Sequence, residues 1–159
     1  MQRTDSSVIM LRAWVVERSP AVVGVSILAA ILLNGLTCWV TTVLSAPLFL
    51  DTVFTLVAAV IFGPVVGAIT GIGSNLFQEI VFGLTGTNWQ FGIVNAASGI
   101  IMGVLASRGL FRNGAHIVIA TLVLTLSNAF LGTLVALFVF GGATGIEVDY
   151  ISMGLLLTG

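Results

Sequence analysis

Four stretches without a single charged residue make up most of this chain, and they span residues 19–50, 52–78, 80–107 and 113–146. Charged residues are 7% of the sequence and hydrophobic residues 58%, whereas soluble domains carry about a quarter charged residues. The stretches lack the roughly ten-residue alternation of apolar and polar residues that is typical of outer-membrane β-barrels. The sequence therefore predicts an all-α integral membrane protein.

The length of the chain sets the number of membrane crossings. One crossing takes about 20 residues, so 159 residues predict a compact bundle of five to six transmembrane helices. Ser19-Pro20 is typical of a helix start, and Gly63-Pro64 of a turn. The expected spans are 20–40, 49–62, 65–83, 91–107 and 117–140. Residues 151–159 are expected to form the first turns of a sixth helix that the sequence does not complete. The predicted organisation is an N-terminal segment, 1–19, and one transmembrane domain, 20–159.

The arginines predict the orientation of the bundle. The chain has no lysine, and its arginines fall only in the N-terminal tail and in the loop after the fourth span: Arg3, Arg12, Arg18, Arg108 and Arg112. Cytoplasmic loops of membrane proteins carry an excess of basic residues. A cytoplasmic N-terminus places all of these arginines inside the cell, because four crossings return the chain to the same side. Asp51 and Glu79 are then expected at or near the outer side.

Small residues recur at four-residue spacing on several predicted helices. Such spacing lets helix backbones approach closely, which favours helix association in a membrane. The repeats are Gly63, Gly67 and Gly71; Asn95, Gly99 and Gly103; and Asn128, Gly132 and Ala136. Packing within the bundle is the expected role of these three repeats. Ser26 and Ala30 form a similar pair on the first helix, where packing and docking of a partner protein both remain open.

Polar side chains concentrate around the turn that joins the third and fourth spans. They are Asn75, Gln78, Glu79, Asn88, Trp89, Gln90 and Asn95. Polar and ionisable groups inside a membrane span are costly and usually face a cavity or a partner. Asn75 and Glu79 share a helix face at i and i+4, so these two and Asn95 are expected to face a pocket for a small polar solute. Capping of helix ends and interfacial anchoring are the alternatives for Asn88, Trp89 and Gln90.

No catalytic arrangement is recognisable in the sequence. The lone His116 falls in the arginine-rich loop, far from Glu79 and from the single Cys38. No Ser-His-Asp, zinc-type or phosphate-binding pattern is present. We therefore expect a protein that is not an enzyme, needs no cofactor or metal, and does not bind nucleic acid.

Residues 47–76, PLFLDTVFTLVAAVIFGPVVGAITGIGSNL, resemble the substrate-binding S component of energy-coupling factor (ECF) transporters. The shared features are Phe49-Leu50-Asp51-Thr52, Ala58-Ala59 before Gly63-Pro64, and a Gly-rich helix ending in Asn75. Residues 91–109, with Asn95 and the terminal Arg108-Gly109, are similar to the fourth helix of that family. The resemblance covers roughly residues 20 to 140.

The resemblance implies a multi-pass subunit of a bacterial-type cell membrane that captures a vitamin or related micronutrient from outside. Its partners are then a T component and two ABC ATPases, which supply the energy for uptake. The connector between the first two helices, with Thr41, Thr42 and Asp51, is implied to gate the pocket. Ser26 and Ala30 are implied to dock on the T component.

Two questions stay open at this point. A multi-span sensor or input domain of a signalling protein is the alternative function, since such domains have similarly short Gly-rich helices. The solute is also open. An ionised Glu79 with Trp89 stacked on the ligand suits a cationic or hydrogen-bond-donating ring of the thiamine-pyrimidine type, whereas flavin-, queuosine- and cobalamin-type ligands remain alternatives.

Overall fold

The computed structural model describes residues 19–44, 50–82, 89–111 and 113–142, and these residues form helices joined by short turns. The elements are α2 (Pro20–Val43), α3 (Val53–Phe62), α4 (Pro64–Val81), the short 3₁₀ helix η1 (Trp89–Phe91), α5 (Gly92–Ser107) and α6 (Gly114–Phe140). The prediction of an all-α chain is confirmed for this part of the sequence. The predicted sixth helix, the segment 1–18 and Asn88 lie outside the described residues.

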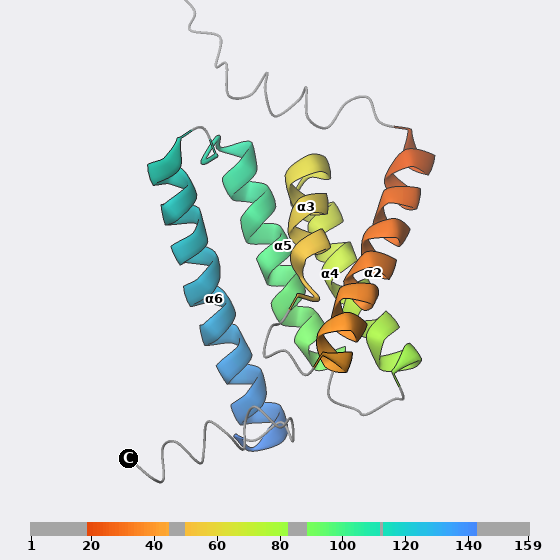
Figure 1. The fold of residues 1–159 in the computed structure, drawn as a ribbon. Helices are drawn as coiled ribbons and strands as arrows, with labels where there is room; N and C mark the ends of the chain where they lie inside the picture. The colour runs from red at the N-terminus through yellow and green to blue at the C-terminus, as the bar shows by residue number, and fades with distance from the viewer. Residues whose placement is uncertain (1–18, 45–49, 83–88, 112, 143–159) are drawn as a thin grey trace, which may run out of the picture.

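The α-helices of the described residues, α2 to α6, run alternately up and down (Figure 1). Pro20, the Gly63-Pro64 turn and the turn that contains Arg108 lie at one end of the bundle, which we call the Arg108 end. The last turns of α2, α4 and α6 lie towards the opposite end, beside η1, which we call the η1 end. The prediction that the N-terminus of the first helix and the arginine-rich loop share one side of the bundle agrees with this arrangement.

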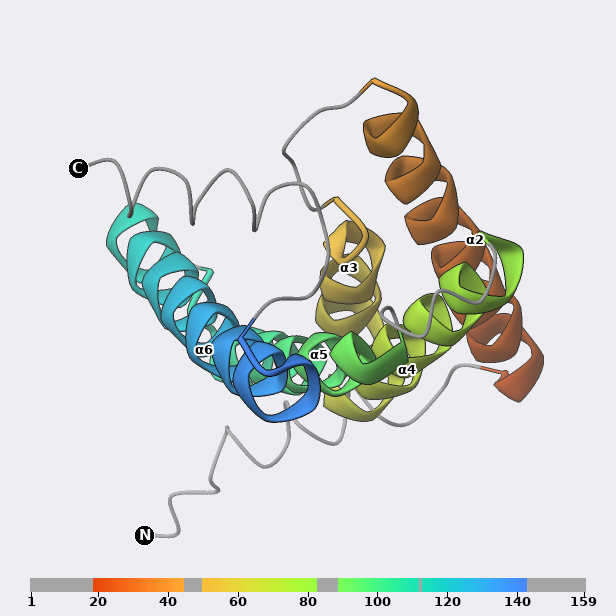
Figure 2. The same cartoon turned by 90° about the horizontal axis from the view of Figure 1, so that it is seen from below.

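Helix α3 is short and begins well inside the bundle (Figure 1). It has 10 residues, against 24 in α2 and 18 in α4. It packs against α2, α4 and α5. Seen from the η1 end, α6, α5 and α4 form a row, with α3 and α2 to one side of it (Figure 2). At the η1 end, α3 therefore does not extend as far as α2, α4 and α5 do (Figure 1).

Burial in this fold is the reverse of burial in a soluble protein. In the described part of the chain the buried hydrophobic residues are small, five alanines and Val94, whereas ten polar or charged residues are buried. Large apolar side chains instead cover the outside, for example Leu28 at 63% exposure and Phe138 at 84%. Soluble proteins do not expose apolar surface on this scale, so the outer surface of the bundle is suited to lipid.

Three described helical segments are long and apolar enough to cross a membrane: Pro20–Val43, Trp89–Ser107 and Gly114–Phe140. Val53–Phe62 is equally apolar but short. Helix α4 has the length of a span but carries Ser74, Asn75, Gln78 and Glu79, all buried. The chain is thus consistent with a helical membrane protein in which α4 presents its polar residues to the interior.

Helices α4 and α5 touch through their backbones. A Cβ atom added to Gly99 would lie 2.5 Å from the carbonyl carbon of Gly67, and one added to Gly71 would lie 2.6 Å from the carbonyl carbon of Asn95. Gly103 meets Pro64 in the same way, at 2.5 Å from its Cα. The predicted close packing of these two glycine repeats is confirmed, and it determines how near the polar side chains of α4 and α5 come to each other.

The third small-residue repeat does not pack in this way. Asn128 is exposed, and a Cβ atom added to Gly132 would meet no atom within 4 Å. Helix α6 contacts mainly α5 and η1, and Ala120 is its one buried residue in the described part of the chain. Near the η1 end the rings of Phe91 and Phe140 stack at 6.0 Å. The prediction of close packing at Asn128, Gly132 and Ala136 is therefore wrong for the described helices, because no helix lies against that face.

Candidate functional site

Asn34, at the centre of α2, joins three helices. Its Nδ2 donates to Thr55 Oγ1 of α3 and to Ser74 Oγ of α4, each at 2.9 Å. Its Oδ1 accepts from the backbone N–H of Phe54 at 2.9 Å, which satisfies one of the free amides in the first turn of α3. The side chain is fully buried. Asn34 donates both amide hydrogens and its oxygen accepts one, so its side chain holds α2, α3 and α4 together.

Asn95 of α5 makes a second junction where α3 begins. Its Nδ2 donates to Asn75 Oδ1 of α4 at 2.5 Å and to Asp51 Oδ2 at 3.1 Å. Its Oδ1 accepts from Thr52 Oγ1 at 2.6 Å. Asn95 thus holds α4 and the start of α3 against α5, and it orients the carboxylate of Asp51. Sequence reasoning expected Asn95 to contact the solute, and the structure shows its two amide hydrogens already donated within the protein.

Gln78 and Glu79 lie one helical turn beyond these junctions, towards the η1 end. Gln78 follows Ser74 by four residues, and Glu79 follows Asn75 by four, so each lies beneath its predecessor on α4. Gln78 is 2% exposed and Glu79 is 6% exposed. Within the described part of the chain, the buried Nε2 of Gln78 has no hydrogen-bond partner. A buried polar group without a partner is uncommon in proteins and calls for an explanation.

Asp51 lies in the turn that leads into α3, next to the N-cap residue Thr52. Asp51 is half-buried there, and its Oδ2 accepts a hydrogen bond from the side-chain amide of Asn95. The N-terminus of a helix also favours negative charge nearby. No basic residue occurs between Arg18 and Arg108 in the sequence, so residues 19–107 carry the carboxyl groups of Asp51 and Glu79 but no cationic side chain.

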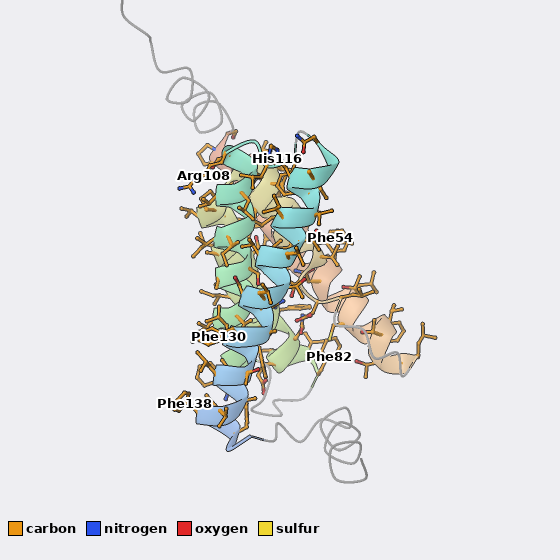
Figure 3. The ribbon with its side chains drawn as sticks, turned by 90° about the vertical axis from the view of Figure 1, so that its left-hand side faces the viewer. Phe54, Phe82, Arg108, His116, Phe130 and Phe138 are labelled. Atoms are coloured by element: carbon orange, nitrogen blue, oxygen red, sulfur yellow. The ribbon has the colours of Figure 1, made fainter. Side chains whose placement is uncertain are left out.

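Figure 3 shows how far the basic groups lie from this region. Arg108 and His116 lie together at one end of the bundle, and Phe82, at the end of α4, lies in the other half. The described basic side chains are thus at the Arg108 end, whereas Gln78 and Glu79, in the last turn of α4, lie towards the η1 end.

The other predicted site residues are placed less centrally. Trp89 is 51% exposed, at the start of η1, and Gln90 is half-buried beside it. Thr41 is buried, but its hydroxyl donates to carbonyls of its own helix, as does that of the exposed Thr42. On the first helix, Ala30 is buried and Ser26 is half-buried. The structure therefore brings together Asp51, Asn75, Gln78, Glu79 and Asn95, and it leaves Thr42 and Trp89 at the surface.

Sequence reasoning missed Asn34 and Thr52. Asn34 follows the apolar run ILAAILL, residues 27–33, and lies well inside the first span, so its position deep in a membrane helix is the signal that could have found it. Thr52 lay within the motif that carried the family resemblance, but the hydrogen bond to Asn95 depends on a contact between residues 43 positions apart. No local pattern encodes such a contact.

A paired substitution tests the junction at Asn95. Thr52→Val removes the hydroxyl that donates to Asn95 Oδ1 and keeps the shape of the side chain, so we expect a loss of about 1 kcal/mol in unfolding free energy. Thr42→Val is the control, because its hydroxyl bonds only to its own helix on an exposed face. Reversible unfolding in mixed micelles measures both. Equal effects of the two substitutions would contradict a junction at Asn95.

No protein-family model matches this chain, and neither the curated proteins nor the solved structures contain a match.

Proposed function

We propose that this chain is a substrate-capture subunit of a membrane uptake system of the energy-coupling factor type. In this proposal the N-terminus is cytoplasmic, the η1 end faces outward, and a vitamin-like solute binds among Asp51, Gln78 and Glu79. A T component and two ABC ATPases supply the energy for uptake. The subunit itself binds and reorients without covalent chemistry, in the cell membrane of a bacterial-type cell.

The observation that carries this proposal is the buried polar cluster around the start of α3. Polar and ionisable groups in a membrane bundle are costly, and they are usually retained at substrate pathways or between helices. Asn34 and Asn95 are accounted for by bonds between helices. Gln78 is not accounted for in this way, since its amide nitrogen is buried without a partner among the described residues. A bound solute would supply that partner.

The positions of the arginines support the proposed orientation. Arg108 lies at the same end as the start of α2, which follows the tail that carries Arg3, Arg12 and Arg18. Under the positive-inside rule that end is cytoplasmic. The polar cluster then lies in the outer half of the bundle, on the side from which a solute for uptake arrives.

Purification of the intact chain from its native membranes separates this proposal from its alternative, a sensor or input domain. We expect a second membrane protein and two ABC-type ATPase subunits to copurify in stoichiometric amounts. Copurification of a signalling kinase without ATPase subunits would favour the sensor. Recovery of the chain without any ATPase after mild crosslinking would contradict the transport proposal.

A further inference from the structure

The direction of the Gln78 side chain follows from the contacts of its neighbours on α4. Ser74 faces Asn34 of α2, and Asn75 faces Asn95 of α5. At 3.6 residues per turn, Gln78 projects at an angle between those of Ser74 and Asn75 and one turn nearer the η1 end. It therefore points between α2 and α5, below the position at which α3 begins. Asp51 and Thr52 lie at the start of α3, so Gln78 is directed towards the region between them and the η1 end.

The ionisable side chains of this region are acidic. Asp51 and Glu79 supply two carboxyl groups, and Asp51 Oδ2 accepts from a neutral amide, that of Asn95. Residues 19–107 contain no lysine, arginine or histidine. An opposite charge nearby favours a carboxylate that is partly removed from water, as half-buried Asp51 is, and in residues 19–107 no side chain supplies one.

The chain also offers a hydrogen-bond donor in the same place. Gln78 Nε2 is buried and has no partner in the described part of the protein. An amide nitrogen can only donate, so its partner on a ligand would be an acceptor such as a carbonyl, ring nitrogen or hydroxyl oxygen. Among the described residues no group of three or more His, Cys, Asp or Glu could hold a metal ion. An organic ligand therefore suits this region better than a bare cation.

We infer that the site beneath α3 selects a small organic cation that also carries a hydrogen-bond acceptor. The positive charge lies against the carboxylate of Asp51, and the acceptor receives the amide hydrogen of Gln78. Asn95 holds Asp51 in place and acts as a positioning residue. This inference rests on the proposed function, because it names the class of solute that the capture subunit takes.

A series of three ligands of similar shape and different charge tests the inference. The probes are the cation 3-carbamoyl-1-methylpyridinium, its uncharged analogue 3-methylbenzamide, and the anion 3-methylbenzoate. Binding to the full chain in lipid nanodiscs is measured by calorimetry. We expect the cation to bind at least about tenfold more tightly than the uncharged amide, because the carboxylate of Asp51 attracts the ring charge, and the anion to bind least. Equal affinities, tighter binding of the anion, or no saturation by the cation up to about 10 mM would overturn the inference.

Variants assign the selectivity to particular residues. Asp51→Asn keeps an oxygen that can accept from Asn95 and removes the charge, so the preference for the cation should fall to about twofold or less. Gln78→Leu should weaken the cation and the amide alike, by about fivefold, because both carry the same acceptor. Arg108→Gln is the control at the opposite end of the bundle and should leave the preference unchanged. A preference for the cation that survives Asp51→Asn would overturn the inference.

These outcomes are separable from those of the proposed function. Selective binding of the cation by a chain that copurifies with no ATPase would retain the site and reject transport. An ATPase-associated chain that prefers the anion would retain transport and reject the inferred class of solute.

Discussion

Asn34→Leu is expected to destabilise the bundle by about 2–4 kcal/mol. The substitution removes three hydrogen bonds at once and leaves Thr55, Ser74 and the amide of Phe54 without their partner in the interior. Buried groups left in this state lose more than an average hydrogen bond contributes, because they cannot reach water. Reversible unfolding of the purified protein in mixed detergent–lipid micelles measures the effect.

Asn128→Leu is the matched control for Asn34→Leu. Both residues lie within long apolar helices, but Asn128 is on the exposed side of α6. Replacing an exposed asparagine by leucine in a lipid environment is favourable on insertion scales, so we expect a change of less than about 0.5 kcal/mol or a small gain in stability. A similar loss in both variants would show that Asn34 has no special role in joining α2, α3 and α4.

Gly99→Ala is expected to cost about 2–3 kcal/mol by forcing α4 and α5 apart. The added methyl group would lie 2.5 Å from the carbonyl carbon and 2.6 Å from the carbonyl oxygen of Gly67, and a helix backbone cannot yield as a flexible side chain can. The separation would also lengthen the Asn75–Asn95 hydrogen bond one turn away. We therefore expect weaker solute binding together with the lower stability.

Gly132→Ala controls for the general effect of placing alanine in a helix. Gly132 has open space around it, so the methyl group meets nothing within 4 Å. Alanine is the better helix former by about 1 kcal/mol in a helix interior, and the variant should be as stable as the wild type or more stable. Destabilisation by Gly132→Ala equal to that by Gly99→Ala would contradict backbone contact as the cause.

Much of the fold could be predicted from the sequence, because its signals are local. Charge-free runs of helix length predicted the helices, and Gly63-Pro64 predicted the turn between α3 and α4, where Gly63 has a φ of 95° and Pro64 opens the next helix. The glycine spacing on α4 and α5 predicted the close crossing of these helices. The small residues on α6 have the same four-residue spacing, but no described helix packs against them. The spacing shows that another helix could approach closely, and it does not show whether one does.

The candidate site was predicted less completely, because its function depends on partners from different helices. Asn75, Gln78 and Glu79 could be grouped from their spacing on one helix. The different roles of the amide side chains could not be predicted, because they depend on which amide hydrogens are already donated. Asn34 and Asn95 donate theirs within the protein, whereas Gln78 Nε2 has no acceptor among the described residues. Residues whose amide hydrogens are donated within the protein hold the helices together, whereas an amide without an acceptor is the candidate for contact with a ligand.

Native mass spectrometry of the intact chain, released from membranes without denaturation, tests the central claim most directly. The claim is that a solute completes the polar cluster beneath α3. We predict that the wild-type protein carries one small molecule and that Gln78→Leu, folded by its unfolding profile, carries much less. Equal occupancy in the two proteins, or no bound molecule on the wild type in solute-rich medium, would contradict the claim.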